Sequence, residues 1–262
     1  MLSKDQRQAA SDFLWQHWQQ GLRTSGLPEA IRPTTHAEGY AIQSLIESRS
    51  AKPIFGWKIA ATSQEGQAHI GVDGPLAGRL LAERVVTSGA TLPLKTNLMK
   101  VAELELGFLL GRDIAPRRKP YTIDEVMNVV DALHVGIEIP DSRFEDFITA
   151  GAPQLLADNA CADYYVLGPA APKQWRSLDL SKHKVKGIVV GKYDRDGLGG
   201  NVLGDPRIAL TWLANELSKI GGGLKAGQVV TTGTCLLPLE VDSGDEVAGD
   251  FGQLGRVSVR LS

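Results

Sequence analysis

The chain has 262 residues, with 28 Lys and Arg against 30 Asp and Glu and a formal net charge of −2. This balance, without a run of basic residues interleaved with aromatics, argues against a nucleic-acid partner. The 43% hydrophobic and 22% charged fractions are typical of a packed globular protein. No apolar stretch approaches the roughly 18 residues that span a bilayer, so we expect no membrane segment and a cytoplasmic location. The two cysteines, Cys161 and Cys235, lack metal-site spacing and are expected to be buried free thiols.

Two amphipathic helices are predicted at the N-terminus. Ser3 and Gln6 have the spacing of a capping box, and apolar residues then recur at helical intervals. A second helix is predicted to begin at Thr35, with Glu38 as its capping-box partner. We therefore expect residues 1–52 to form an N-terminal helical layer.

From residue 53 onward, short apolar runs punctuated by glycine predict strands. These runs are PIFGWKIAAT, RVVTSGATL, VAELELGFLL, LHVGIEI, DYYVLG, VKGIVVG, QVVTTG and GRVSVRL. Helices are predicted between them at 62–69, 122–131 and 205–220, each with a capping residue at its start. Because strands outnumber helices and do not alternate strictly with them, we predict an α+β fold with a mixed or barrel-like sheet. We expect residues 53–262 to form a catalytic β-roll domain, as one structural unit with the helical layer.

A pair of glutamates stands in the predicted strand VAELELGF. Strand periodicity places Glu103 and Glu105 on one face and the leucines on the other. Two neighbouring carboxylates repel each other unless a cation or a shared proton neutralises them. The alternative interpretation is a polar stripe on a solvated outer face.

A third carboxylate favours a metal site over the solvated stripe. Glu138 stands alone in an apolar strand, where a buried glutamate needs a partner. Three carboxylates without a nearby histidine suit a hard cation, Mg²⁺ or Mn²⁺, which prefers oxygen ligands and keeps positions open for a chelating substrate.

Lys58 is another charged residue within an apolar run, PIFGWKIAA. It is either an exposed edge lysine or a cation facing the metal pocket, where burial would lower its pKa for proton transfer. Thr62 and Ser63 follow at a predicted helix start and offer hydroxyls and free backbone N–H groups to an anion. Helix capping alone would also explain them.

From about residue 53 to its end, the chain resembles the hydratase/decarboxylase branch of the fumarylacetoacetate hydrolase superfamily. The segments that carry the resemblance are GWKIAATS (56–63), GVDGPLAGRLL (71–81), VAELELGFLL (101–110), EIPDSR (138–143), LADNA (156–160), GDPRIALTWLANEL (204–217), LKAGQVVTTGT (224–234) and GDFGQLGRVSVRL (249–261). The resemblance implies a β roll or barrel with peripheral helices that assembles as a homo-oligomer. It also allows another enzyme of the same pathway as a binding partner.

For the site, the resemblance implies that Glu103, Glu105 and Glu138 bind Mg²⁺ or Mn²⁺ and that Lys58 acts in catalysis or substrate binding. Two departures stand out. Leu76 and Ala77 occupy a segment where family hydratases frequently have an acidic residue, and a threonine, Thr234, stands where a serine is frequent. The threonine retains a hydroxyl for the substrate.

The resulting hypothesis is a hydratase that adds water to a 2-hydroxy-2,4-dienoate to give a 4-hydroxy-2-oxo acid, in the catabolism of aromatic compounds. Lys58 is the first candidate for proton transfer and Asp158 the second, unless Asp158 is an ordinary loop or capping residue. Ser142 and Arg143 are candidates for binding a substrate oxygen or carboxylate, unless Arg143 pairs with Asp141 to hold its loop.

Three rival hypotheses remain open. A decarboxylase of a 2-oxo-3-enedioate would use the same chelation. A hydrolase of β-diketo acids would need a His-Glu pair, and the five histidines include no obvious one. An inert relative that serves as an assembly partner would be expected to lack ligands, whereas all three glutamates are present.

Overall fold

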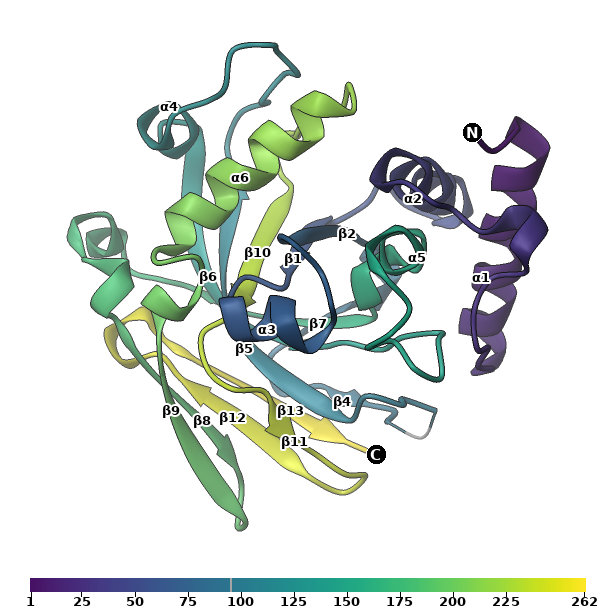
Figure 1. The fold of residues 1–262 in the computed structure, drawn as a ribbon. Coiled ribbons are helices and arrows are strands. Elements are labelled where there is room, and N and C mark those ends of the chain that lie inside the picture. Colours follow the sequence, from purple (N-terminus) through teal and green to yellow (C-terminus); the bar gives the residue numbers. More distant parts are fainter. Residues whose placement is uncertain (95) are drawn as a thin grey trace.

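The structure, a computed structural model, describes residues 1–94 and 96–262, which fold into two packed β-sheets with helices on their flanks (Figure 1). The larger sheet has the strand order β2-β1-β10-β5-β6-β7-β3, and β11 pairs with β5 outside this path. Its strands are β1 (Gly56–Ala60), β2 (Leu76–Leu80), β3 (Val85–Thr87), β5 (Val101–Leu110), β6 (Val130–Ile139), β7 (Tyr164–Ala170), β10 (Val229–Thr234) and β11 (Leu239–Glu240). The sheet is mixed: β1 is parallel to β10 and β3 is parallel to β7, whereas the other pairs along this path are antiparallel.

The smaller sheet has the order β4-β13-β12-β8-β9 and packs on the larger one. Its strands are β4 (Thr91–Leu92), β8 (Lys184–Val189), β9 (Tyr193–Leu198), β12 (Glu246–Asp250) and β13 (Arg256–Leu261). The two sheets meet through glycines. A methyl group on Gly249 of β12 would lie 3.0 Å from Leu104 of β5, and one on Gly168 would lie 3.0 Å from Val257 of β13. The apolar face of β5 therefore forms the core between the sheets.

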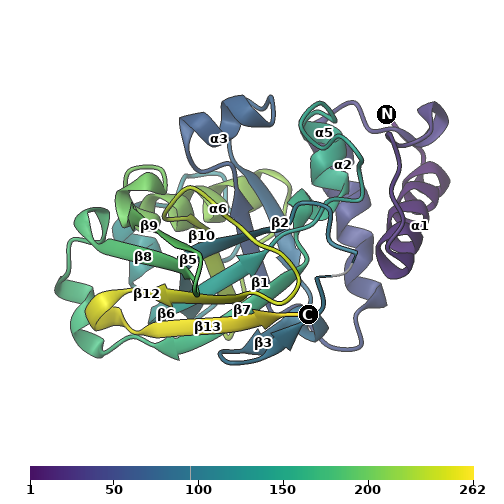
Figure 2. The ribbon, with the colours of Figure 1, turned by 90° about the horizontal axis from the view of Figure 1, so that it is seen from below.

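The helices lie outside the sheets. They are α1 (Lys4–Gln20), α2 (His36–Gln43), α3 (Gln64–His69), α4 (Ile123–Met127), α5 (Ala152–Ala157) and α6 (Pro206–Lys219). Helix α6 lies beside β10 with α4 next to it, whereas α1 and α2 gather with α5 at one end of the molecule (Figures 1 and 2). No helix in the described part of the chain is both long and apolar enough to cross a membrane.

The N-terminal layer shares its core with the rest of the chain. Ala10, Leu14 and Ile42 belong to the same buried cluster as the residues between the sheets. Gln43 of α2 donates from its side-chain amide to the carbonyl oxygens of Ala77 and Leu156, at 2.8 Å each. The hydrophobic core and the hydrogen bonds thus connect the residues on the two sides of the predicted boundary at residues 52 and 53. The division of the chain into these two regions stays a prediction.

The predicted α+β class with a mixed sheet and an N-terminal helical layer is confirmed. The capping box of Ser3 and Gln6 starts α1 as predicted. Two helix predictions need correction. The helix predicted over 122–131 ends at Met127, because Val130 already pairs with β5. The helix predicted from Thr62 is capped instead by Ser63, whose hydroxyl accepts from the N–H of Gly66.

Candidate metal centre

Three carboxylates converge on one face of the larger sheet. Glu103 and Glu105 lie on β5, and Glu138 lies on β6 directly opposite Glu103 in the strand register. Directly opposed residues of an antiparallel pair point to the same side of a sheet. One carboxylate oxygen from each of the three lies within 4.8 Å of the other two. Among the described residues, this trio is the group of acidic, histidine or cysteine side chains whose geometry suits a metal ion.

Two of the three carboxylates are fully buried and short of hydrogen-bond partners. One oxygen of Glu105 accepts from the backbone N–H of Gly233 at 3.0 Å. Its other oxygen and Oε2 of Glu138 have no hydrogen-bond partner among the described residues, and Oε1 of Glu138 has only the ammonium of Lys58, at 3.0 Å. Buried carboxylate oxygens rarely stay without partners, because their desolvation is then uncompensated. A hard divalent cation such as Mg²⁺ or Mn²⁺ fits these oxygens.

The electrostatics of the trio also fit a cation. Burial raises the pKa of Glu103 to about 7, with the charge of Glu138 adding to the rise and the ammonium of Lys58 opposing it. Burial and the charges of Glu138 and Glu103 raise the pKa of Glu105 well above its ordinary range. The like charges thus oppose ionisation, and a bound divalent cation would favour it.

Lys58 on β1 is the cation that the structure places beside the carboxylates. Its side chain is buried, and Nζ lies 3.0 Å from Oε1 of Glu138 and donates to the carbonyl oxygen of Ala160 at 3.1 Å. The expectation that burial lowers its pKa is wrong. Burial by itself does so, but the attraction of the three carboxylates outweighs it and raises the pKa of Lys58. Lys58 is therefore an ammonium at the site.

A left-handed turn holds the acceptor for Lys58. Asn159, Ala160 and Cys161 have φ of 57°, 50° and 59°, a conformation that costs on the order of 1 kcal/mol or more for each non-glycine residue. The Asn159 carboxamide stabilises the turn, because it accepts from the backbone N–H of Arg79 at 2.7 Å and donates to its carbonyl oxygen at 2.8 Å. This left-handed turn was not predicted from the sequence. Its one signal is the asparagine, which tolerates positive φ better than most residues.

The predicted substrate hydroxyls lie on one wall of a large cavity. Thr62, Ser63 and Thr234 all line it. Thr62 packs against Gly233, whose φ is +101° and where a methyl group would lie 2.1 Å from the threonine oxygen. Ser63 caps α3 through its oxygen, and Thr234 donates to the carbonyl oxygen of Leu236 at 2.8 Å. The two hydroxyls are therefore engaged in local hydrogen bonds.

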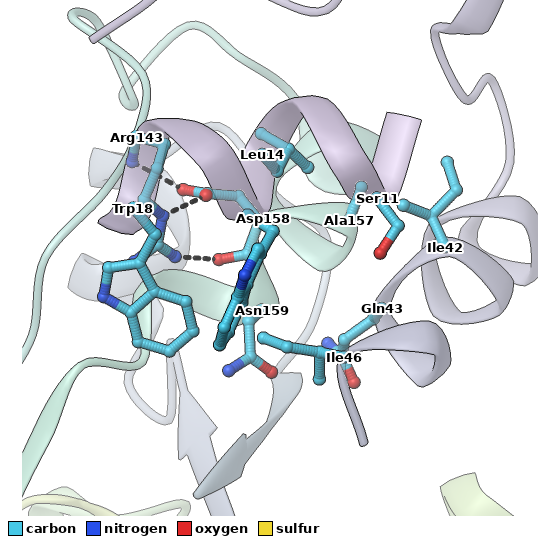
Figure 3. Close-up of a pocket in the computed structure, with 11 residues that line it drawn as sticks. Ser11, Leu14, Trp18, Ile42, Gln43, Ile46, Arg143, Ala157, Asp158 and Asn159 are labelled. Atoms are coloured by element: carbon cyan, nitrogen blue, oxygen red, sulfur yellow. Dashed lines mark hydrogen bonds and ion pairs between the residues drawn. The ribbon is translucent and has the colours of Figure 1, made fainter. Parts of the chain in front are cut away.

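The other predicted site residues form a separate buried cluster beneath α1 (Figure 3). Asp158 accepts from the hydroxyl of Ser142 at 2.8 Å, from the backbone N–H of Arg143 at 3.0 Å and from the Arg143 guanidinium. The guanidinium also lies over the ring of Trp18, 4.8 Å from its centroid. The alternative pairing of Arg143 with Asp141 is wrong, because Asp141 pairs with an arginine of the N-terminal region. Asp158, Ser142 and Arg143 do not line the cavity that holds Lys58.

The large cavity connects the carboxylates with the outside. It has a volume of about 1210 Å³ and is open to solvent. Lys58 and Glu103 line its inner end, whereas residues of α3 and of the segment from Leu236 to Glu240 line its mouth. Glu105 and Glu138 lie behind Glu103, outside the lining. Of the three carboxylates and Lys58, a small molecule in the cavity therefore contacts Glu103 and Lys58.

Comparisons with known proteins agree with this architecture. Residues 78–262 match the family described as "Fumarylacetoacetate (FAA) hydrolase C-terminal". The 2-keto-4-pentenoate hydratase of Paraburkholderia xenovorans (strain LB400) is 32% identical over 98% of this chain and 95% of that protein. A 2-oxo-hept-4-ene-1,7-dioate hydratase of Escherichia coli is 29% identical over 87% of each. The 4-oxalocrotonate decarboxylase of Pseudomonas putida G7, solved with magnesium and adipate, superposes with a TM-score of 0.90 at 25% identity, covering 100% of this chain and 99% of that one. The chain belongs to the fumarylacetoacetate hydrolase family.

Proposed function

We propose that the chain is a metal-dependent hydro-lyase that adds water to a 2-hydroxy-2,4-dienoate of the 2-oxopent-4-enoate type and yields a 4-hydroxy-2-oxo acid. The observation that carries the proposal is the buried carboxylate trio beside Lys58, at the inner end of a cavity large enough for such a substrate. Relatives named hydratases along nearly the whole chain support the choice of reaction. A role in the catabolism of aromatic compounds belongs to the same proposal.

Glu103, Glu105 and Glu138 would hold the ion, Mg²⁺ or Mn²⁺. When bound, the ion supplies a Lewis acid that polarises the 2-oxo group of the substrate. The relative solved with magnesium supports this choice, as does the all-oxygen donor set.

The reaction itself needs two proton movements that the protein must assist. Ketonisation moves a proton from the C2 hydroxyl of the dienoate to C5 and leaves a C3=C4 double bond conjugated with the ketone. Water then adds its hydroxyl group to C4 and its proton to C3. The ammonium of Lys58, held between Glu138 and the carbonyl of Ala160, is the positioned group that gives a proton to the substrate at the inner end.

The remaining predicted residues take two different roles in the proposal. Thr62, Ser63 and Thr234 line the cavity and bind the substrate, with Thr62 as the buried member. Asp158 has both of its oxygens engaged with Ser142 and Arg143, so its role is to hold the segment that carries the strained turn.

A decarboxylase is the second candidate. One observation favours it, the close superposition on the 4-oxalocrotonate decarboxylase. The substrate would then be a 2-oxo-3-enedioate that loses CO₂ from its far carboxylate, C6. The electrons of the broken C5–C6 bond pass through C3=C4 into the 2-oxo group, and the product is a 2-hydroxy-2,4-dienoate. We also propose a homo-oligomer, as the family resemblance implies, which light scattering of the purified chain would test.

The test is turnover by the purified full chain in 5–10 mM Mg²⁺, roughly the concentration that saturates weak magnesium sites. One arm uses 2-hydroxypenta-2,4-dienoate and follows the loss of dienol absorbance and the gain of water by mass spectrometry. The other arm uses 2-oxohex-3-enedioate and measures CO₂. A Glu103→Ala/Glu105→Ala double variant is the control and should be inactive in both arms. Hydration supports the first candidate, CO₂ release supports the second, and turnover of neither rejects both.

A further inference from the structure

Apart from Lys58 and Glu103, most of the surface that lines the cavity is apolar. Leu76 and Leu155 are its buried aliphatic members, Phe147 and Leu203 are half-buried, and Leu237 is exposed. Leu76 lies on β2 opposite Ala60 of β1, so two adjacent strands present only aliphatic groups there. This wall offers burial to an apolar group.

Positive charge is confined to the inner end. Of the described residues that line the cavity, Lys58 is the sole lysine or arginine, and it is paired with Glu138 at 3.0 Å. Arg195 is close to the mouth, but its guanidinium is bound to Glu240 at 2.6 Å and to a backbone carbonyl. The mouth itself carries carboxylates, because Glu65 and Glu240 are both lining residues.

These features bear on the far end of the substrate. A second carboxylate at that end would lose water against an apolar wall without gaining a cation, and it would approach two other carboxylates. A methylene group there gains instead, by about a factor of four in affinity for each group that is fully buried. The charge at the far end of the substrate should therefore change its affinity for the cavity more than the length of its chain does.

Resting on the proposed function, we propose that the apolar lining of the cavity, to which Leu76, Leu155 and Leu237 belong, selects 2-oxo acids with an uncharged, apolar far end and rejects dicarboxylates. The preferred substrate is therefore a monocarboxylate whose tail can exceed five carbons, since the cavity volume of about 1210 Å³ leaves room for it. The decarboxylation of an enedioate, the second candidate function, is disfavoured by the same wall.

The experiment is calorimetric binding of saturated 2-oxo acids to the full chain loaded with Mg²⁺. The probes are pyruvate, 2-oxopentanoate, 2-oxohexanoate and the dicarboxylate 2-oxohexanedioate, which matches 2-oxohexanoate in length. We expect affinity to rise by about threefold to fourfold per methylene among the monocarboxylates, and the dicarboxylate to bind at least tenfold more weakly than 2-oxohexanoate. Equal or tighter binding of the dicarboxylate overturns the inference while leaving the proposed function intact. Failure of every probe to bind, pyruvate included, rejects both.

Variants at two positions of the cavity lining test where the far end of the substrate lies. Leu237 is 70% exposed at the mouth, so replacing it does not disturb the core. We expect Leu237→Lys to raise the affinity for the dicarboxylate, relative to the affinity for 2-oxohexanoate, by about threefold to tenfold. The uncharged Leu237→Gln is the matched control and should leave this ratio of affinities unchanged. If Leu237→Lys leaves the ratio of the two affinities unchanged, the far end of the bound 2-oxo acid does not lie beside Leu237, and the proposal is overturned. His69, an exposed lining residue on α3, is the other group able to carry positive charge, and loss of dicarboxylate binding in His69→Gln would also overturn it.

Discussion

Replacing Glu103 by glutamine should stabilise the metal-free protein at neutral and alkaline pH. Burial raises the pKa of Glu103 from 4.5 to about 7, so the folded chain binds this proton more tightly than the unfolded chain does. Below pH 4.5 Glu103 is protonated in both the folded and the unfolded chain, so its raised pKa does not change the free energy of unfolding. As the pH rises from 4.5 to 7, the folded state loses stability, and above pH 7 the full cost remains.

The magnitude follows from the size of the shift. A rise of about 2.5 pKa units corresponds to about 3 kcal/mol, and screening by water in the cavity reduces it to about 1–3 kcal/mol. Glu103→Gln removes this cost, so in EDTA at pH 8 the variant should melt about 2–10 °C above the wild type, whereas at pH 4.5 the two should melt together. With Mg²⁺ present the order reverses, because the wild type gains stability from the ion and the variant has lost a ligand.

Differential scanning calorimetry at pH 4.5 and 8, with EDTA or with Mg²⁺, checks all four conditions. The exposed Glu145, changed to glutamine, is a matched control for loss of one negative charge. The reasoning is refuted if Glu103→Gln melts below the wild type in EDTA at pH 8, or if Mg²⁺ stabilises both proteins equally. Either result would mean that the three carboxylates do not share a cation-binding point.

Three further substitutions separate chemistry from structure. Lys58→Met, which keeps the length of the side chain, should lower kcat by about 100-fold or more and leave the Mg²⁺-induced rise in Tm in place; near-wild-type turnover would exclude Lys58 as the proton carrier. Asp158→Asn leaves Arg143 buried without its counter-ion and should cost about 3–5 kcal/mol in urea unfolding, with kcat of the folded fraction changed only a few-fold; the opposite pattern would make Asp158 catalytic. Gly233→Ala forces a methyl group against Thr62 at positive φ and should raise KM and lower Tm, and unchanged kinetics would show that this wall does not touch the substrate.

Much of the fold was predictable because it depends on local patterns. Apolar alternation marked β5 and β6, and capping boxes marked the starts of α1 and α4. The elements that were not predicted are those that form because of contacts with residues distant in the sequence. Strand β2 was not among the predicted strands, and it forms because β1 pairs with it along five residues.

In the candidate site, too, the features that depend on local sequence were predicted and those that depend on distant contacts were not. The three glutamates and Lys58 were recognisable because charged residues are out of place in apolar strands, and the structure brings all four together. The strained turn was not recognisable, because its stability comes from the Asn159 amide bonding to the backbone of a strand about 80 residues away. Asp158 was a plausible acid by composition, and only the fold shows its oxygens engaged with Arg143.

The alternation of β5 explains how the protein holds three repelling carboxylates. Leu104 and Leu106 are completely buried, and Leu104 packs against the smaller sheet, so the strand cannot rotate to release Glu103 and Glu105 into water. The register with β6 fixes Glu138 opposite them in the same way. Core packing on one face therefore maintains an electrostatically unfavourable arrangement on the other, which a cation can relieve. Since Glu103 alone of the three lines the cavity, it is the carboxylate whose surroundings a substrate alters directly.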